Sequence, residues 1–250
     1  MDINKANRQV ADVLIQELNT KELFLDFKTA NTTTTNISGD SVYAMAKGSK
    51  RIAFPNSPEG TLTIEAQVYP IKVYALYSDG AIDNKGVYGE TQTIKATEAG
   101  KLTIKVPANG TIQTGTLFAY PADSAGDKNA VIEGEYSEGV FTATSADKIK
   151  VDTEYAVSYI LNRTGVKKVS INAKRVPHDY FITMSTVDKD EDGVFTPFKQ
   201  TFYKATPQRN FELALSSEGD AAAISMVFDL LENKDGDFVD KIEIVDDEQN

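Results

Sequence analysis

Three aspartates have the spacing of calcium ligands. Asp188, Asp190 and Asp192 alternate, and Gly193 follows where a calcium-binding loop turns sharply. The twelfth position of such a loop is a bidentate glutamate, whereas this chain has Lys199 there, and the flanking residues are typical of strands rather than helices. We therefore interpret the segment as an exposed acidic hairpin turn and expect no metal or other cofactor.

The residue types that carry most hydrolase chemistry are scarce. The chain has no cysteine and a single histidine, His178, so it has no thiolate nucleophile, no Cys-ligated metal and no multi-histidine site. Asp179 follows His178 directly, but adjacent residues in an extended segment point to opposite faces and do not easily form a catalytic dyad. The sequence therefore indicates a protein that is not an enzyme.

The charge balance argues against a nucleic-acid-binding protein. The 250 residues include 26 Lys and Arg against 37 Asp and Glu, which gives a formal net charge of −11. Basic residues are scattered, so binding of phosphate by counterion release is disfavoured. No stretch approaches the ~18 apolar residues of a membrane span, and we see no secretory signal, so we expect assembly in the cytoplasm and no membrane insertion.

Apolar residues alternate with polar ones at a period of two. Leu62, Ile64, Ala66 and Val68 are separated by polar side chains, which predicts a half-buried strand. Similar patterns predict strands at 211–217 and 221–231, a hairpin at 11–27, and one short helix at 70–77 that begins at Pro70. Many short strands separated by turn residues indicate an all-β sandwich or barrel.

The segment 91–164 is predicted to be an inserted domain. It contains seven short apolar runs, from TQTIKA through KIKV at 148–151 to YAVSYIL, with Gly, Asn or Asp between most of them. We interpret it as a small immunoglobulin-like β-sandwich within a larger β-domain formed by 1–90 and 165–250.

Two segments then resemble a known family. KGSKRIAF at 47–54 and EGTLTI at 59–64 precede the predicted helix and insertion, and PFKQTFYKATPQRNFELALSSEGD follows at 197–220. In this order the motifs are similar to the two halves of the major tail, or tail tube, proteins of tailed bacteriophages. The resemblance covers about 10–90 and 165–245 and leaves the insertion uncovered.

The resemblance implies a structural virion protein. Six copies would close into a ring whose inner sheets fuse into one barrel, which removes exposed strand edges, and stacked rings would form the tube through which phage DNA is ejected. The implied partners are other copies of the chain, a tape measure protein, a terminator protein and, in a contractile tail, a sheath.

One face of the predicted strands is a candidate for the tube lumen. It carries small polar residues and carboxylates and no Lys or Arg, so it would repel phosphate and let DNA pass without adhesion. The candidates are Thr63, Glu65, Gln67, Glu212, Ser216, Ser225 and Asp229. A solvated sheet face is the alternative interpretation of the same pattern.

A basic cluster is the candidate for contact between rings. Lys47, Lys50 and Arg51 lie where the family has a long loop or hairpin that reaches the next ring, and the acidic 188–192 turn is one counterpart for them. The N-terminal arm, 1–9, is a second candidate for contact with a neighbour.

Two other functions are alternatives. Other virion parts, such as capsid decoration or tail-completion proteins, are also cysteine-poor β-rich assemblies. A carbohydrate- or surface-binding β module would use exposed aromatic residues of the insertion, with Tyr120, Tyr136 and Tyr155 as its candidates.

Overall fold

The computed structural model describes residues 4–210 and 221–245 of the chain. It consists mainly of antiparallel strands with a few 3-10 helices, which confirms the all-β prediction. The strands are β1 (Lys5–Ala6), β2 (Asp12–Glu17), β3 (Leu23–Phe27), β4 (Thr32–Ser38), β5 (Ser41–Ala46), β6 (Ser49–Pro55), β7 (Glu59–Ala66), β8 (Asp83–Lys95), β9 (Lys101–Thr103), β10 (Gly110–Ile112), β11 (Phe118–Pro121), β12 (Gly134–Ser137), β13 (Val140–Ala143), β14 (Glu154–Lys168), β15 (Tyr180–Asp190), β16 (Phe195–Pro207), β17 (Ile224–Leu231) and β18 (Val239–Glu243). The 3-10 helices are η1 (Ile71–Tyr77), η2 (Ala122–Ser124), η3 (Lys128–Ala130) and η4 (Ala146–Lys148).

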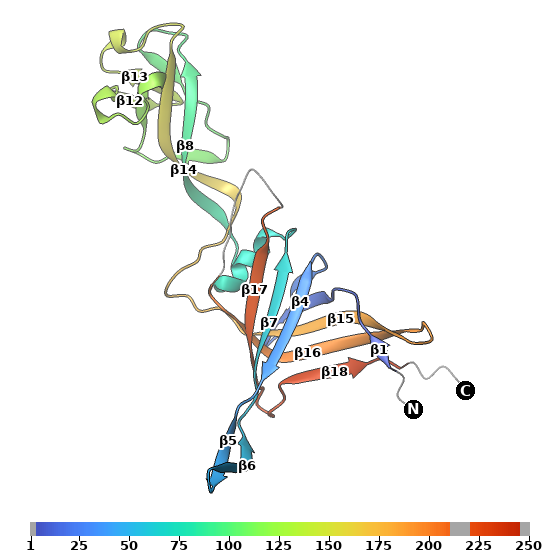
Figure 1. The fold of residues 1–250 in the computed structure, drawn as a ribbon. Coiled ribbons are helices and arrows are strands. Elements are labelled where there is room, and N and C mark those ends of the chain that lie inside the picture. The colour runs from blue at the N-terminus through green and yellow to red at the C-terminus, as the bar shows by residue number, and fades with distance from the viewer. Residues whose placement is uncertain (1–3, 211–220, 246–250) are drawn as a thin grey trace. The chain divides into compact units, whose positions relative to one another are not determined.

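The chain divides into two compact units (Figure 1). Unit 1 comprises Met1–Ala81 and Val169–Asn250, and unit 2 comprises Ile82–Lys168. Residues 91 and 164, the expected limits of the insertion, lie within β8 and β14 rather than in connecting loops.

Unit 1 is built on one curved sheet with the strand order β3-β2-β15-β16-β17-β7-β4. Strand β16 joins its two parts, because residues 198–202 pair with β18 and residues 204–207 pair with β17. Figure 1 shows β4, β7 and β17 crossing the direction of β15, β16 and β18. The core lies between these two parts and combines Leu62 and Phe228 of one with Ile182 of the other, all fully buried.

Two predicted local elements of unit 1 are confirmed, and one detail is wrong. The 11–27 hairpin is formed by β2 and β3, and the 70–77 helix is the 3-10 helix η1, which follows Pro70 and buries Leu76 and Tyr77. Val68 is 68% exposed because β7 ends at Ala66, so the alternation does not continue to that residue. The predicted strand at 211–217 lies outside the described residues.

Unit 2 contains two sheets of its own. In the first, β8 pairs along almost all of β14, and β11 and β10 pair with residues 155–158 and 161–163 on the other edge of β14. The second has the order β12-β13-β9. Their facing sides share a buried core that includes Leu102, Phe141 and Leu161. The run KIKV is not a strand, contrary to the prediction: it lies at helix η4 and the turn after it, with Ile149 buried. The short strand β10 was missed.

Candidate assembly surfaces

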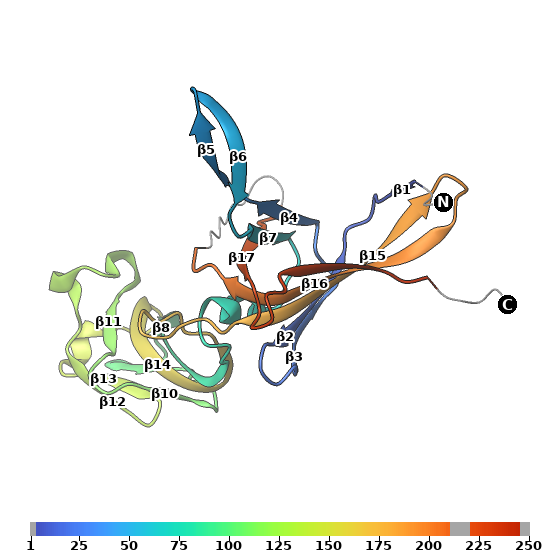
Figure 2. The ribbon, with the colours of Figure 1, turned by 90° about the horizontal axis from the view of Figure 1, so that it is seen from below.

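A β-hairpin emerges where β4 and β7 pair at Ser38 and Glu59 (Figure 2). Its strands, β5 and β6, form a two-stranded sheet of their own. The two-residue turn consists of Lys47 and Gly48, both with positive φ, at 51° and 77°. This is the backbone of a type I′ turn, whose twist matches that of the flanking strands. The sequence KGSKRIAF therefore folds locally into a defined hairpin.

One face of this hairpin is apolar and uncovered. Val42 pairs with Phe54 and Ala44 pairs with Ile52, so these side chains lie on the same face. Phe54 is 55% exposed and Val42 60%. Isolated two-stranded hairpins are marginally stable in water, and exposed apolar patches of this kind mark interaction sites. The apolar face is a surface that sequence reasoning missed.

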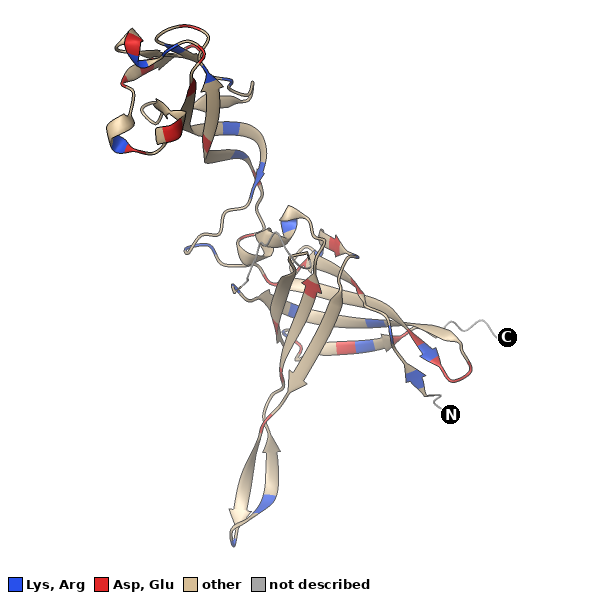
Figure 3. Ribbon diagram, turned by 45° about the horizontal axis from the view of Figure 1, so that its top comes forward, with Lys and Arg blue, Asp and Glu red and all other residues tan. Residues whose placement is uncertain are grey.

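The predicted basic cluster lies on the same hairpin, near its turn (Figure 3). Lys47 is in the turn, Lys50 pairs with Met45, and Arg51 is the extra residue of a bulge between that pair and the Ala44–Ile52 pair. All three basic residues are exposed. The structure thus brings them together at one end of an apolar surface.

The outward face of β4, β7 and β17 contains several of the predicted lumen residues. Thr63 pairs with Val227, and Glu65 pairs with Ser225, so these residues share one face of the sheet. Asp229 lies on this face beside Thr61 and accepts a hydrogen bond from Gln208 Nε2 at 2.6 Å.

Other predicted lumen residues are placed differently. Gln67 follows the end of β7, where its backbone N–H donates to Asn31 Oδ1. Glu212 and Ser216 lie outside the described residues. The face also continues onto β16, where it includes one base, Lys204, whose ammonium lies 3.6 Å from the Asp179 carboxylate.

Strand β4 is a free edge of the unit 1 sheet. It pairs with β7 continuously from Thr32 to Ser38, and no described strand pairs with its other side. Its sequence, TTTTNIS, contains no proline, charge or bulge, the devices that usually protect edges. The opposite edge, β3, contains Asp26 and a register shift against β2. The run of four threonines at 32–35 is therefore part of an unprotected edge.

The acidic segment is the turn of the β15–β16 hairpin. Asp190 closes it, because its carboxylate accepts the Val194 N–H at 2.7 Å, and Asp188 accepts Asn7 Nδ2 at 2.9 Å. Among the described residues, no group of three or more His, Cys, Asp or Glu side chains could hold a metal ion.

The described part of the N-terminal arm lies along its own subunit, since Lys5 pairs with Asp190 in the sheet.

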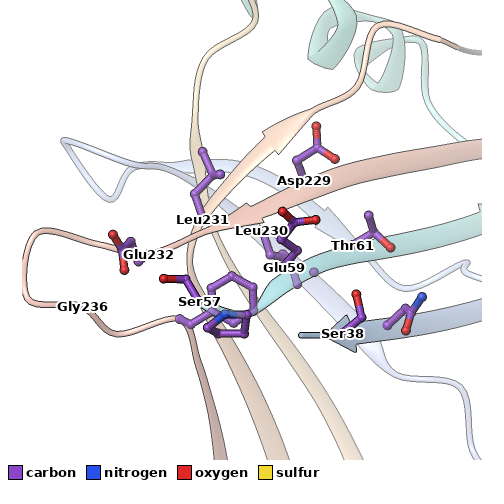
Figure 4. Close-up of a pocket in the computed structure, with 13 residues that line it drawn as sticks. Ser38, Ser57, Glu59, Thr61, Asp229, Leu230, Leu231, Glu232 and Gly236 are labelled. Carbon is purple, nitrogen blue, oxygen red and sulfur yellow. The ribbon is translucent and has the colours of Figure 1, made fainter. Parts of the chain in front are cut away.

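A groove of about 480 Å³ lies at the base of the β5–β6 hairpin (Figure 4). The ends of β4, β7 and β17 and the loop before β18 line it. Its charged residues are all acidic: Glu59, Asp229 and Glu232. The groove therefore offers hydrogen-bond acceptors to a basic partner.

A partly exposed polar cluster holds the segment after β14 against the end of helix η1. Arg175 Nη1 lies 3.0 Å from the Asp79 carboxylate, and Ser78 Oγ donates to the Ser170 carbonyl at 2.6 Å. Partial desolvation opposes ionisation of Asp79, but backbone N–H groups of Asp79 and Ala81, with Arg175, lower its pKa below the usual value. Burial, with the nearby carboxylates of Glu17 and Asp79, raises the pKa of Tyr180. These groups have a structural role.

Comparison with known proteins adds one match. The model of the YomU/Tube protein family matches residues 8–242, which includes both units. No curated protein sequence matches the chain. Within the described ranges, no helix is long and apolar enough to cross a membrane.

Proposed function

Because the chain belongs to the YomU/Tube protein family, a family of phage tail tube proteins, we propose that it closes into six-membered rings that stack into the tail tube. The chain is a structural component of a virion tail that assembles with other tail components. The proposed role is not catalytic. In it, the tube forms in the host cytoplasm and conducts phage DNA during ejection.

The exposed apolar face of the β5–β6 hairpin carries the stacking part of the proposal. Phe54 and Ile52 are 55% and 56% exposed, so burial by a neighbouring subunit would contribute about half of the 1.5–3 kcal/mol of a full burial, roughly 1 kcal/mol each. Lys47, Lys50 and Arg51 would then fix the register against carboxylates of the next ring, such as those of the 188–192 turn. A repeated head-to-tail contact of this kind is heterologous and propagates along an axis.

The free edge of β4 supports ring closure. An unprotected edge presents unpaired N–H and C=O groups that another strand can satisfy, and closure into a barrel removes such edges. Addition of a neighbour's strand to β4 would extend the face that carries Thr63, Glu65 and Ser225 around the ring. This face would be the lumen, across which carboxylates repel phosphate over about 8 Å at physiological salt.

The tube's further partners follow from its two ends and its outside. We propose a tape measure protein in the lumen, a terminator at one end and, if the tail is contractile, a sheath around it. Electron microscopy of the purified full chain tests the assembly: hollow sixfold rings and tubes are expected. Persistent monomers at high concentration would contradict the proposal.

A hairpin variant separates stacking from ring closure. The triple substitution Val42→Ser/Ile52→Ser/Phe54→Ser removes the apolar face but leaves the turn and the β4 edge unchanged. We expect rings without tubes, because only the contact between rings is weakened. Tubes of normal length would show that another surface joins the rings. The control variant Val87→Ser, which changes an exposed apolar residue of unit 2, should form normal tubes.

A further inference from the structure

The outward face of the unit 2 sheet formed by β8, β14 and β11 lacks charge over most of its length. On β8, Lys85 and Lys95 mark its limits, and the outward residues between them include Val87, Thr91 and Thr93. These positions span roughly 20 Å at about 3.4 Å per residue. One residue in four of this chain is charged, so an extended uncharged surface is a distinct feature.

Aromatic and aliphatic side chains lie on this face among hydroxyl and amide groups. Phe118 pairs with Ser158 and is 44% exposed, and Ile160, two residues further along β14, is also exposed. Asn162 follows on the same face and pairs with Val87. The core-facing residues of β14, such as Val157, are buried, so the exposed set is the outer side of a well-packed sheet.

Gly89 lies opposite Ile160 in the middle of β8 and has no structural requirement for glycine. Its φ is not positive, and a Cβ built there would meet no atom within 4 Å. Gly86 on the same strand is different, because its Cβ would lie 3.0 Å from Val166 Cγ2. A glycine inside a strand weakens it and often marks a place where a ligand or another backbone approaches closely.

We propose that this face, termed the platform, binds a neutral polysaccharide. A sugar ring would lie with its C–H face on Phe118 and approach the bare backbone at Gly89. Its hydroxyls would exchange hydrogen bonds with Ser158, Thr91 and Asn162. The length of the platform suits a linear chain of sugars running along β14.

The composition of the platform favours a neutral glycan over other partners. It offers no base to phosphate or carboxylate groups, so nucleic acids and polyanions gain no charge pairing there. A stable protein interface buries about 800 Å² per partner around a dry apolar centre. The scattered apolar groups among hydroxyls on this face do not form such a centre. The proposal does not depend on tube formation.

Surface plasmon resonance with the full chain immobilised tests the platform. The probes are three soluble neutral polysaccharides, dextran, mannan and laminarin, with hyaluronate as the anionic comparison. We expect a saturable response to at least one neutral probe and none to hyaluronate. Phe118→Ala should weaken binding at least about tenfold. Phe195→Ala, which removes an exposed phenylalanine of unit 1, is the matched control and should bind normally.

Gly89→Val separates a ligand role from a structural one. Valine favours strands and has free space at this position, so the melting temperature should stay the same or rise, whereas binding should be lost. The proposal is wrong if no neutral probe binds, if hyaluronate binds equally, or if both variants bind like the wild type. It is also wrong if Gly89→Val changes only self-association, measured by light scattering, since the platform would then be a contact between copies.

Discussion

The Lys50 ammonium lies 3.9 Å from the centroid of the Tyr43 ring, across the two strands of the β5–β6 hairpin. An exposed contact of this kind contributes about 0.5–1 kcal/mol and orients the lysine along the hairpin. The basic side chain and the apolar face therefore lie on one element, which would reduce the conformational entropy lost in the proposed contact with a neighbour.

Charge reversal on the hairpin should block tube growth. In Lys50→Glu/Arg51→Glu we expect a folded chain whose melting temperature falls by at most a few degrees, because both residues are exposed and only the Lys50–Tyr43 contact is lost, but no tubes in electron micrographs. Lys148→Glu/Lys150→Glu, on unit 2, is the control and should assemble normally. If the 188–192 turn is the counterpart, Glu191→Lys/Asp192→Lys should restore growth of the reversed hairpin. Normal tubes from the reversed hairpin alone would remove it from the interface.

Proline in β4 should distinguish its two sides. The N–H groups of Thr34 and Thr35 point to opposite sides of the strand, so one donates towards β7 and the other lies on the free edge. Of Thr34→Pro and Thr35→Pro, we expect one to lower the melting temperature and the other to leave it nearly unchanged while preventing ring formation. Thermal melts and sedimentation of both variants check this. Normal rings from the stable variant would show that β4 does not add a neighbour's strand.

The limits of the insertion can be tested with two fragments. We expect residues 82–168 expressed alone to unfold cooperatively, because they contain both sheets and the whole unit 2 core. The fragment 91–164 lacks the residues of β8 that pair with Tyr159 to Thr164 and should be less stable or unfolded. Urea titrations followed by circular dichroism compare them. Equal stability would show that the first part of β8 adds nothing to the unit.

Removal of the Tyr180 hydroxyl should cost little. This oxygen is buried and has no hydrogen-bond partner among the described residues. Tyr180→Phe should therefore change the free energy of unfolding by less than ~1 kcal/mol, and in the stabilising direction if at all. Tyr180→Ala should lower it by about 3–5 kcal/mol, since the ring packs against Phe24 in the core. A large loss in Tyr180→Phe, measured by urea denaturation, would reveal a partner for the hydroxyl.

The ion pair of Asp79 predicts a pH-dependent difference in stability. Because the folded state lowers the pKa of Asp79, its carboxylate stabilises the fold above the ordinary carboxyl pKa near 4. This contribution disappears as the pH falls through the lowered pKa. Asp79→Asn should therefore melt below the wild type at pH 7, and the two should converge in strong acid. Arg175→Gln should move the convergence towards higher pH, and parallel curves for Asp79→Asn at all pH values would contradict the assignment.

Much of the fold could be predicted because alternation reports burial directly. The residues Leu62, Ile64 and Ala66 are buried as their spacing indicates, and Pro70 precedes the one helix that was expected. The pairing of β18 with β16 could not be predicted, because local patterns do not identify a strand's neighbour. The strand predicted at KIKV is absent for a related reason. Ile149 is buried by tertiary packing just after a 3-10 helix, and apolar content alone does not distinguish such a buried residue from one in a strand.

The candidate site was only partly visible in the sequence. The basic residues 47, 50 and 51 could be identified because a cluster of positive charges is conspicuous in a chain with more acidic than basic residues. The apolar face of the same hairpin was missed because Val42 and Phe54 look like core residues until the structure shows nothing packed on them. In unit 2, Tyr155 is predicted to be a surface residue, but it is 3% exposed and its hydroxyl accepts the Lys150 N–H, whereas Phe118 is 44% exposed.

Asp83 and Lys168 pair at the point where unit 2 begins and ends, and their side chains form an ion pair at 3.2 Å. Neighbouring strands lie about 4.8 Å apart, so the chain leaves unit 1 and returns to it through almost the same position. Any domain with similarly close termini could replace unit 2 without stretching the strands of unit 1. The pair is thus a graft point, and if the chain forms the proposed tube, enzymes or antigens inserted there would be displayed in a regular array.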